Sequence, residues 1–165
     1  MESLFRALNE AGARYVVVGG VATVLHGFAR FTADVDLMID LHPTEARKVL
    51  STLTSLGLEP RVPVPAEDFA DPAIRAEWIS TKNMQVFSMV DRENPMRVVD
   101  LFVDHPIAFE EIWRGSEVVD LETTQVRIAG IDDLIRLKQL AGRPQDLVDI
   151  EGLEEIRKRQ APDEG

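Results

Sequence analysis

Residues 15–40 constrain the fold more than any other part of the sequence, because two apolar runs enclose a glycine pair and a helical pattern. Tyr15–Val18 consists of strand-forming residues and is interrupted by Gly19 and Gly20. Apolar residues then recur at helical spacing as far as about Gly27, and residues 32–39 again have the composition of a strand. This strand, helix, strand order predicts a mixed α/β core.

The rest of the chain extends this core with further helices and strands. The apolar spacing and the positions of glycine and proline predict helices over residues 2–12, 43–57, 106–113, 131–142 and 144–156. They predict strands over residues 84–90, 96–103, 118–121 and 124–128. The proline-rich stretch 59–72 is expected to be a loop, and the charged tail from Arg157 is expected to fray.

The predicted fold class is therefore α/β (α+β), a sheet flanked by helices with further helices at the C-terminal end. We expect one domain over residues 1–165, with a core at about 14–128 and a helical part at about 130–160.

Composition and charge exclude several functional classes. The chain has 165 residues, of which 45% are hydrophobic and 28% charged, and it lacks cysteine, so disulfides and cysteine-based zinc sites are ruled out. No segment has the pattern of a signal peptide or membrane span, and we expect a cytoplasmic protein without a membrane partner. The net charge of −11 repels polyanions, so we expect no extended binding to duplex DNA.

Two carboxylates stand one residue apart at the predicted second strand. Since side chains alternate along a strand, Asp34 and Asp36 share one face while Val35 and Leu37 take the other. Two close carboxylates repel each other, and either a raised pKa or a bound cation relieves the repulsion. Oxygen ligands with an open coordination sphere favour Mg²⁺ or Mn²⁺. The alternative interpretation is a solvated Asp-x-Asp at a strand end.

A third acid, Asp100, lies in the middle of the apolar strand predicted over residues 96–103. A carboxylate there is costly unless it has a partner. If this strand lies beside the strand of Asp34 and Asp36, three carboxylates can hold two divalent ions and support the displacement of a phosphoryl group.

The glycine pair offers a complementary site for phosphate. A glycine turn from strand to helix lets backbone N–H groups approach a phosphate chain, because no Cβ blocks the approach. Phosphates at Gly19 and Gly20, together with metal ions at the aspartates, would hold one nucleoside triphosphate. Thr23, one helical turn further on, is a candidate for a hydroxyl contact to phosphate or, alternatively, for capping.

These motifs resemble the nucleotidyltransferase superfamily whose best-known member is DNA polymerase β. The resemblance rests on Gly19-Gly20, on Arg30 to Leu37 with the sequence RFTADVDL, and on Val99-Asp100-Leu101. The arginine and threonine ahead of Asp-x-Asp are similar to the stand-alone bacterial AbiEii-type nucleotidyltransferases, which are toxins of toxin-antitoxin and phage-defence systems. The glycine pair departs from the Gly-Ser of many superfamily members.

The resemblance implies a mixed sheet flanked by helices and an acidic triad that binds two Mg²⁺ ions and an NTP. Asp34, Asp36 and Asp100 are the implied catalytic and metal-binding residues. The segment 137–150 resembles the C-terminal signature of the AbiEii-type proteins, which places Lys138, Arg143 and Asp146 at the nucleotide.

Each of these basic residues also has a structural alternative. Arg30 and Thr32 flank the acids; Arg30 would bind triphosphate oxygens or pair with an acid. Lys138 and Arg143 would face the cleft or belong to an ordinary helix pair, in which Asp146 stabilises a first turn and Asp149 lies on the exposed face.

The predicted function is transfer of an NMP from an NTP to a protein, a tRNA or a small molecule, with a toxin role and an antitoxin partner implied by the resemblance. The alternative is a catalytically silent nucleotide-binding or antitoxin-like module of the same fold. The sequence shows neither the preferred base nor the acceptor.

Overall fold

A computed structural model of the chain describes residues 1–161. The described part contains a seven-stranded mixed sheet with strand order β3-β4-β5-β2-β1-β7-β6, and this arrangement confirms the predicted α/β class. Its strands are β1 (Tyr15–Val18), β2 (Val35–Ile39), β3 (Leu58–Pro60), β4 (Val86–Asp91), β5 (Val98–Phe102), β6 (Glu117–Asp120) and β7 (Gln125–Ile128).

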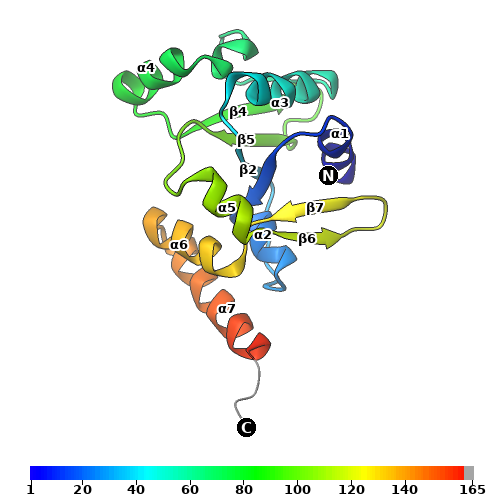
Figure 1. Cartoon of the computed structure of the whole chain (residues 1–165), viewed down its shortest axis with the longest axis vertical. Coiled ribbons are helices and arrows are strands. Elements are labelled where there is room, and N and C mark those ends of the chain that lie inside the picture. Colours follow the sequence, from blue (N-terminus) through cyan, green and yellow to red (C-terminus); the bar gives the residue numbers. More distant parts are fainter. Residues whose placement is uncertain (162–165) are drawn as a thin grey trace.

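Seven α-helices and one 3₁₀ helix surround this sheet in the described residues. They are α1 (Glu2–Glu10), α2 (Gly19–Leu25), α3 (Pro43–Ser55), η1 (Ala66–Ala70), α4 (Pro72–Lys82), α5 (Phe109–Gly115), α6 (Ile131–Ala141) and α7 (Pro144–Gln160). Figure 1 shows α3 and α4 at one end of the long axis and α6 and α7 at the other.

The centre of the sheet is the pairing of β2 with its two neighbours. β2 runs antiparallel to β1 and parallel to β5, and its residues Val35, Leu37 and Ile39 are buried in the core. Its own sequence therefore reads as an almost continuous apolar run, as expected for a strand covered on both faces. Asp36 is the exception, and a charged residue at the centre of such a sheet requires an explanation from the site.

Several sequence-based boundaries need correction. The second strand begins at Val35 and not at residue 32, so Asp34 lies in the bend that precedes it. The glycine pair does not precede α2 but forms its first two residues. The tail from Arg157 is not frayed within the described residues, since α7 continues to Gln160; residues 162–165 lie outside them.

The largest error concerns residues 58–82. The predicted loop contains β3 and η1, and a whole helix, α4, follows it. Asp71 caps α4 by accepting a hydrogen bond from the backbone N–H of Ala73 at 2.9 Å. The helix was missed because its sequence lacks a continuous apolar stripe; it is held mainly by Trp78, which stacks on Phe87 at a ring distance of 5.3 Å.

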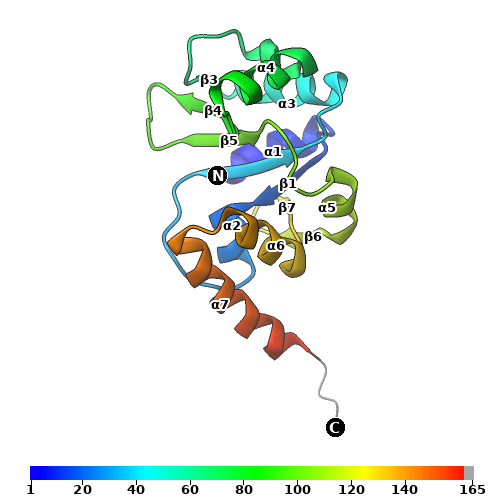
Figure 2. The same cartoon turned by 90° about the vertical axis from the view of Figure 1, so that its left-hand side faces the viewer.

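The loop between α2 and β2 is fixed to α7 by close packing. The ring of Phe28 lies directly against the backbone of Gly152, and a Cβ at Gly152 would overlap ring atoms of Phe28. In Figure 2 this loop runs beside α7 on its way to β2. The contact matters because the residues after Phe28 lead to Asp34 and Asp36.

We predict that Gly152→Ala lowers the free energy of unfolding by about 1–3 kcal/mol, because the added methyl forces the Phe28 ring to move. Denaturant unfolding measures this change. The matched control is Glu151→Ala at the exposed neighbouring position, which should leave stability nearly unchanged. Equal effects of the two substitutions would contradict the packing described here.

Candidate active site

The turn from β1 into α2 requires glycine at both positions. Gly19 has φ +67°, which side-chain-bearing residues rarely adopt, and a Cβ there would overlap the carboxylate of Asp36. A Cβ at Gly20 would overlap the Thr32 hydroxyl. The two glycines therefore allow Asp36 and Thr32 to lie directly against the start of α2.

Asp36 and Asp100 are brought together by strand register. They are direct partners in the parallel pairing of β2 with β5, so their side chains emerge next to each other. Ser88 on β4 is the next residue in the same row, and its hydroxyl donates to Asp100 Oδ1 at 2.5 Å. The Asp100 strand thus lies beside the strand of Asp36, which is the condition on which the expected acidic site depends.

The environment of Asp36 and Asp100 raises the pKa of both carboxyl groups. Burial, followed by the charges of Asp100 and Asp34, raises the pKa of Asp36 to about 7. Burial also raises the pKa of Asp100, whereas the hydrogen bond from Ser88 acts in the opposite direction. Within residues 1–161, neither Asp36 nor Asp100 forms an ion pair. Two adjacent acids are thus held without a cationic partner in direct contact.

The third predicted ligand is placed differently. Asp34 is exposed and lies before β2, and the described residues contain no cluster of three or more His, Cys, Asp or Glu side chains in a geometry ready to hold a metal ion. The donor chemistry of Asp36 and Asp100 nevertheless fits Mg²⁺, which typically takes one or two carboxylates and completes its shell with water and phosphate oxygens.

A basic group faces these acids from α6 and α7. Lys138 is 4% exposed, and its ammonium lies 2.8 Å from Asp149 Oδ2 and 3.9 Å from Asp146 Oδ1. The charges of Arg143 and Lys138 oppose the rise in the pKa of Asp36, so both lie within electrostatic reach of the acids. Since Lys138 is buried while it is paired, its position is fixed rather than mobile.

Asp149 organises this basic group, and the expectation that it lies on an exposed face is wrong. It is fully buried and accepts hydrogen bonds from Lys138 Nζ at 2.8 Å, Arg30 Nε at 2.9 Å and Gln145 Nε2 at 2.8 Å. Burial alone would raise the pKa of Asp149, but these three hydrogen bonds outweigh it and lower the pKa. Arg30 therefore pairs with an acid, although with Asp149 and not with Asp34.

Asp146 holds Arg143 at the start of α7. Its Oδ2 accepts from the Arg143 backbone N–H at 3.1 Å and from Arg143 Nε at 2.8 Å, which connects the N-cap residue to the first turn of α7. Asp146 is buried, whereas the Arg143 side chain is 75% exposed. The guanidinium is thus held by Asp146 at Nε and, at 3.4 Å, at Nη2, and it keeps Nη1 available at the cleft.

These groups line one cleft of about 370 Å³, a size in the usual range of small-ligand sites. The lining residues are Gly19, Gly20, Arg30, Phe31, Thr32, Ala33, Asp34, Asp36, Asp100, Lys138, Arg143, Gln145 and Asp146. The structure brings together every predicted site residue except Thr23. Thr23 is fully buried, and its hydroxyl donates to the carbonyl of Gly19 at 2.9 Å, so it stabilises the glycine turn from behind.

Sequence reasoning missed Phe31, Ala33 and Gln145 in the lining and Asp149 behind it. Phe31 and Ala33 alternate with Arg30, Thr32 and Asp34 in one segment, so proximity in sequence was the available signal. No such signal pointed to Asp149. Residues 144–160 have no clear apolar stripe, so the pattern does not indicate which face of α7 is buried.

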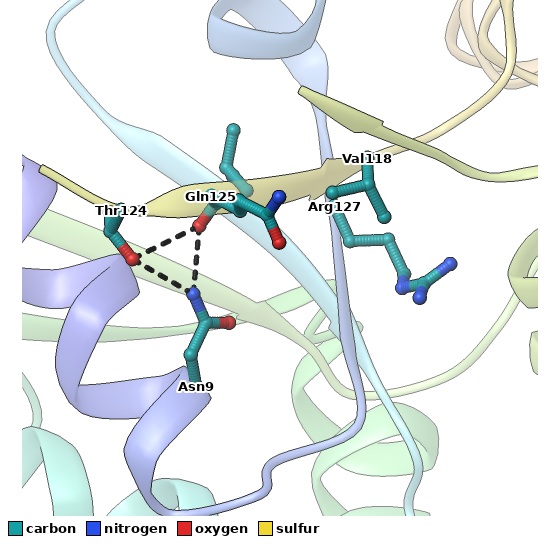
Figure 3. A pocket seen from close by; sticks show the side chains of 6 residues that line it. Asn9, Val118, Thr124, Gln125 and Arg127 are labelled. Carbon is teal, nitrogen blue, oxygen red and sulfur yellow. Dashed lines mark hydrogen bonds between the residues drawn. The ribbon is translucent and has the colours of Figure 1, made fainter. Parts of the chain in front are cut away.

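A second hollow lies between α1 and the hairpin of β6 and β7, away from these acids (Figure 3). There Asn9 Nδ2 donates to the Gln125 carbonyl at 2.8 Å and to the Thr124 hydroxyl at 3.2 Å. Because its polar groups bind one another, this hollow is explained by the docking of α1 on β7.

A family model described as "Nucleotidyltransferase of unknown function (DUF6036)" matches residues 2–158. The chain belongs to this nucleotidyltransferase family. The match supports the superfamily expected from the glycine pair and the aspartates, and it does not confirm the AbiEii type. No functionally curated protein matches the sequence. The described residues contain no helix long and apolar enough to cross a membrane.

Solved structures of low sequence identity share the fold of this nucleotidyltransferase. The lincosamide antibiotic adenylyltransferase LnuA, solved with lincomycin bound, aligns with a TM-score of 0.62 at 14% identity over 94% of each chain. An antigenic nucleotidyltransferase-like protein from Paracoccidioides brasiliensis aligns with a TM-score of 0.57 at 16% identity, over 97% of this chain and 74% of that one. At these identities the similarity concerns the fold alone.

The raised pKa of Asp36 predicts how the stability of the metal-free protein depends on pH. The unfolded chain loses this proton near pH 4 and the folded chain near pH 7, so the folded state binds more protons between these values and stability falls as pH rises. The loss is about 4 kcal/mol at most. We expect Asp36→Asn to flatten this decline in denaturant unfolding between pH 4.5 and 8 in EDTA.

The control for this pH dependence is Glu155→Gln, which removes an exposed carboxylate on α7 that does not contribute to the raised pKa of Asp36. It should keep a slope close to that of the unmodified protein. A steep decline that persists in Asp36→Asn would show that another group titrates.

The Asp149 network predicts a combined effect on stability and on phosphate binding. Asp149→Asn leaves the buried Lys138 and the half-buried Arg30 beside a neutral amide, which should lower the free energy of unfolding by about 3 kcal/mol. NTP binding should weaken as well, because both cations lose their fixed positions. Calorimetry and denaturant unfolding test the two effects.

Glu155→Gln, on the exposed side of the same helix, is the matched control and should change neither quantity. Unchanged stability of Asp149→Asn would contradict the role assigned to the buried carboxylate.

Proposed function

We propose that the protein is a Mg²⁺-dependent nucleotidyltransferase that transfers an NMP from an NTP to an acceptor hydroxyl. The observation that supports this proposal is the cleft itself, in which Asp36 and Asp100 face Lys138 and Arg143 beside a glycine turn. Membership of a nucleotidyltransferase family supports this assignment.

The basic side of the cleft is suited to the triphosphate. Lys138, Arg143 and Arg30 are positively charged, and the bare backbone of Gly19 and Gly20 lets an anion approach closely. Thr32 adds a hydroxyl donor next to Gly20. Held there, the β- and γ-phosphates place the α-phosphorus beside Asp36.

The acidic side is suited to divalent ions, with Asp34, Asp36 and Asp100 as the proposed ligands. Two Mg²⁺ ions, or Mn²⁺, would lower the pKa of the attacking hydroxyl and neutralise charge on the departing pyrophosphate. Asp34 lines the same cleft, and its charge contributes to the raised pKa of both Asp36 and Asp100. A cation that binds Asp36 must displace its proton, so the raised pKa of Asp36 makes the binding of a cation depend on pH near neutrality.

In the proposed reaction the acceptor oxygen forms a bond to the α-phosphorus, and the bond from this phosphorus to the bridging oxygen of pyrophosphate breaks. The hydroxyl proton is released and pyrophosphate leaves with the bonding electrons. The protein contributes position and charge: Lys138 and Arg143 bind the leaving group, and the row of Asp36 and Asp100 fixes the reacting end.

The acceptor candidates are a protein, a tRNA or a small molecule. A small molecule has the support of LnuA, a structural neighbour that is an adenylyltransferase of lincosamide antibiotics. The toxin role and an antitoxin partner rest on the resemblance of the Arg30 to Asp36 segment to AbiEii-type proteins. We assign the protein to the cytoplasm and treat it as one domain in this proposal.

A catalytically silent nucleotide-binding module is the second candidate. The observation in its favour is that, within residues 1–161, Asp34, Asp36 and Asp100 do not form a cluster in a geometry ready to hold a metal ion. Such a module would bind NTP without releasing pyrophosphate.

Label transfer distinguishes these functions. Purified protein is incubated with Mg²⁺, each α-labelled NTP in turn, and cell extract that is afterwards divided into protein, RNA and small-molecule fractions. We expect label in one fraction, reduced at least a hundredfold in Asp36→Ala and Asp100→Asn. Glu155→Gln serves as the active control. NTP binding without any transfer or pyrophosphate release would favour the silent module.

A further inference from the structure

Asp36 and Asp100 form a row of acids across β2 and β5. One cationic side chain, that of Arg61, lies at the opposite end of this acidic row from Lys138 and Arg143. Arg61 follows β3, and its backbone N–H donates to the carbonyl of Ser88 at 2.9 Å. Ser88 is the strand partner of Asp100, and Asp100 is the strand partner of Asp36. Arg61, Ser88, Asp100 and Asp36 are therefore consecutive members of one row across four neighbouring segments.

The spacing of this row places Arg61 near the reacting end of the cleft. Neighbouring strands lie about 4.8 Å apart, so the backbone of Arg61 is about 10 Å from that of Asp100 along the row. The charge of Arg61 opposes the rise in the pKa of Asp100, which agrees with a guanidinium on the same side of the sheet.

The acids around Arg61 are already matched to other cations. Glu59 pairs with Arg92, and Asp91 pairs with Arg97 at 3.5 Å. Arg61 itself is exposed, and its side chain forms no hydrogen bond or ion pair in the part of the chain that the structure describes. An exposed arginine with all donors free, at the edge of an acidic row, is available to a ligand.

The geometry of in-line displacement indicates which of the two substrates, the nucleotide or the acceptor, lies near Arg61. The attacking and leaving oxygens lie on opposite sides of the phosphorus. With the leaving pyrophosphate at Lys138 and Arg143, the attacking hydroxyl enters from the side of Asp100 and Ser88. Arg61 therefore borders the entry path of the acceptor and not the nucleotide.

We propose that Arg61 is a specificity-determining residue that binds an anionic group of the acceptor, a phosphate carried next to the hydroxyl that is modified. This inference rests on the proposed nucleotidyl transfer. A chain of net charge −11 repels such an acceptor overall, and a local arginine offsets the repulsion where the acceptor docks. A polycationic acceptor would instead be repelled at this position.

The test uses the full-length protein saturated with Mg²⁺ and the α,β-methylene analogue of the NTP that binds most tightly, so that the triphosphate site is filled. Ribose 5-phosphate, ribose and kanamycin are then titrated and followed by the NMR shifts of the backbone amides of Arg61 and Ser88. We expect saturable binding of ribose 5-phosphate and at least tenfold weaker binding of ribose and kanamycin.

Arg61→Gln should weaken the binding of ribose 5-phosphate about tenfold, because it removes a charge-assisted hydrogen bond, and Arg61→Lys should restore part of it. Arg47→Gln removes an equal charge from an exposed position on α3, leaves the pair of Glu59 and Arg92 intact, and should have no effect. A short single-stranded RNA with a free 3′ hydroxyl distinguishes the source of the phosphate: much tighter binding than ribose 5-phosphate indicates nucleic acid, and equal binding a small metabolite.

The inference is overturned if ribose 5-phosphate does not bind, if it binds equally well to Arg61→Gln, or if kanamycin binds more tightly. Failure of the NTP analogue to bind in the first step would overturn the proposed nucleotidyl transfer itself, and the two failures are thus told apart.

Discussion

The cleft depends on a separation of charge that the fold enforces. Lys138 and Arg30 would neutralise the acids of β2 and β5 if they were free to reach them, but the buried carboxylate of Asp149 holds both. Asp36 and Asp100 consequently remain adjacent and without an ion pair among the described residues. One side of the site therefore carries carboxylates without a cationic partner, and the other side carries cations in fixed positions. Such a site is suited to a ligand that carries both anionic phosphates and metal ions.

Asp149 has this influence because it connects three parts of the chain. Through Lys138 it joins α6 to α7, and through Arg30 it joins α7 to the loop that leads into β2. The packing of Phe28 on Gly152 reinforces the second connection. The C-terminal helices are therefore part of the site, and the position of the acidic row relative to the basic group follows from how α7 docks.

The order of the strands determines which residues continue the acidic row away from Lys138 and Arg143. Placing β5 next to β2 brings Asp100 beside Asp36, and placing β4 and β3 beyond β5 adds Ser88 and then Arg61 to the same row. One line across the sheet thus passes from the glycine turn, through the two acids, to Arg61, whose side chain has no partner within residues 1–161. In our proposals the nucleotide binds at the end of this line that carries the glycine turn, and the acceptor docks at the end that carries Arg61.

The sequence by itself determined the central elements and the candidate residues. Gly19, Gly20, Asp36 and Asp100 could be recognised because glycines at a strand end and carboxylates within apolar strands are costly or unusual wherever the chain folds. The register that makes Asp36 and Asp100 neighbours, the helix α4, and the burial of Asp149 were decided only by tertiary structure. Pairing between distant strands, and the burial of a helix face without an apolar stripe, depend on contacts far apart in sequence, and local patterns do not encode them.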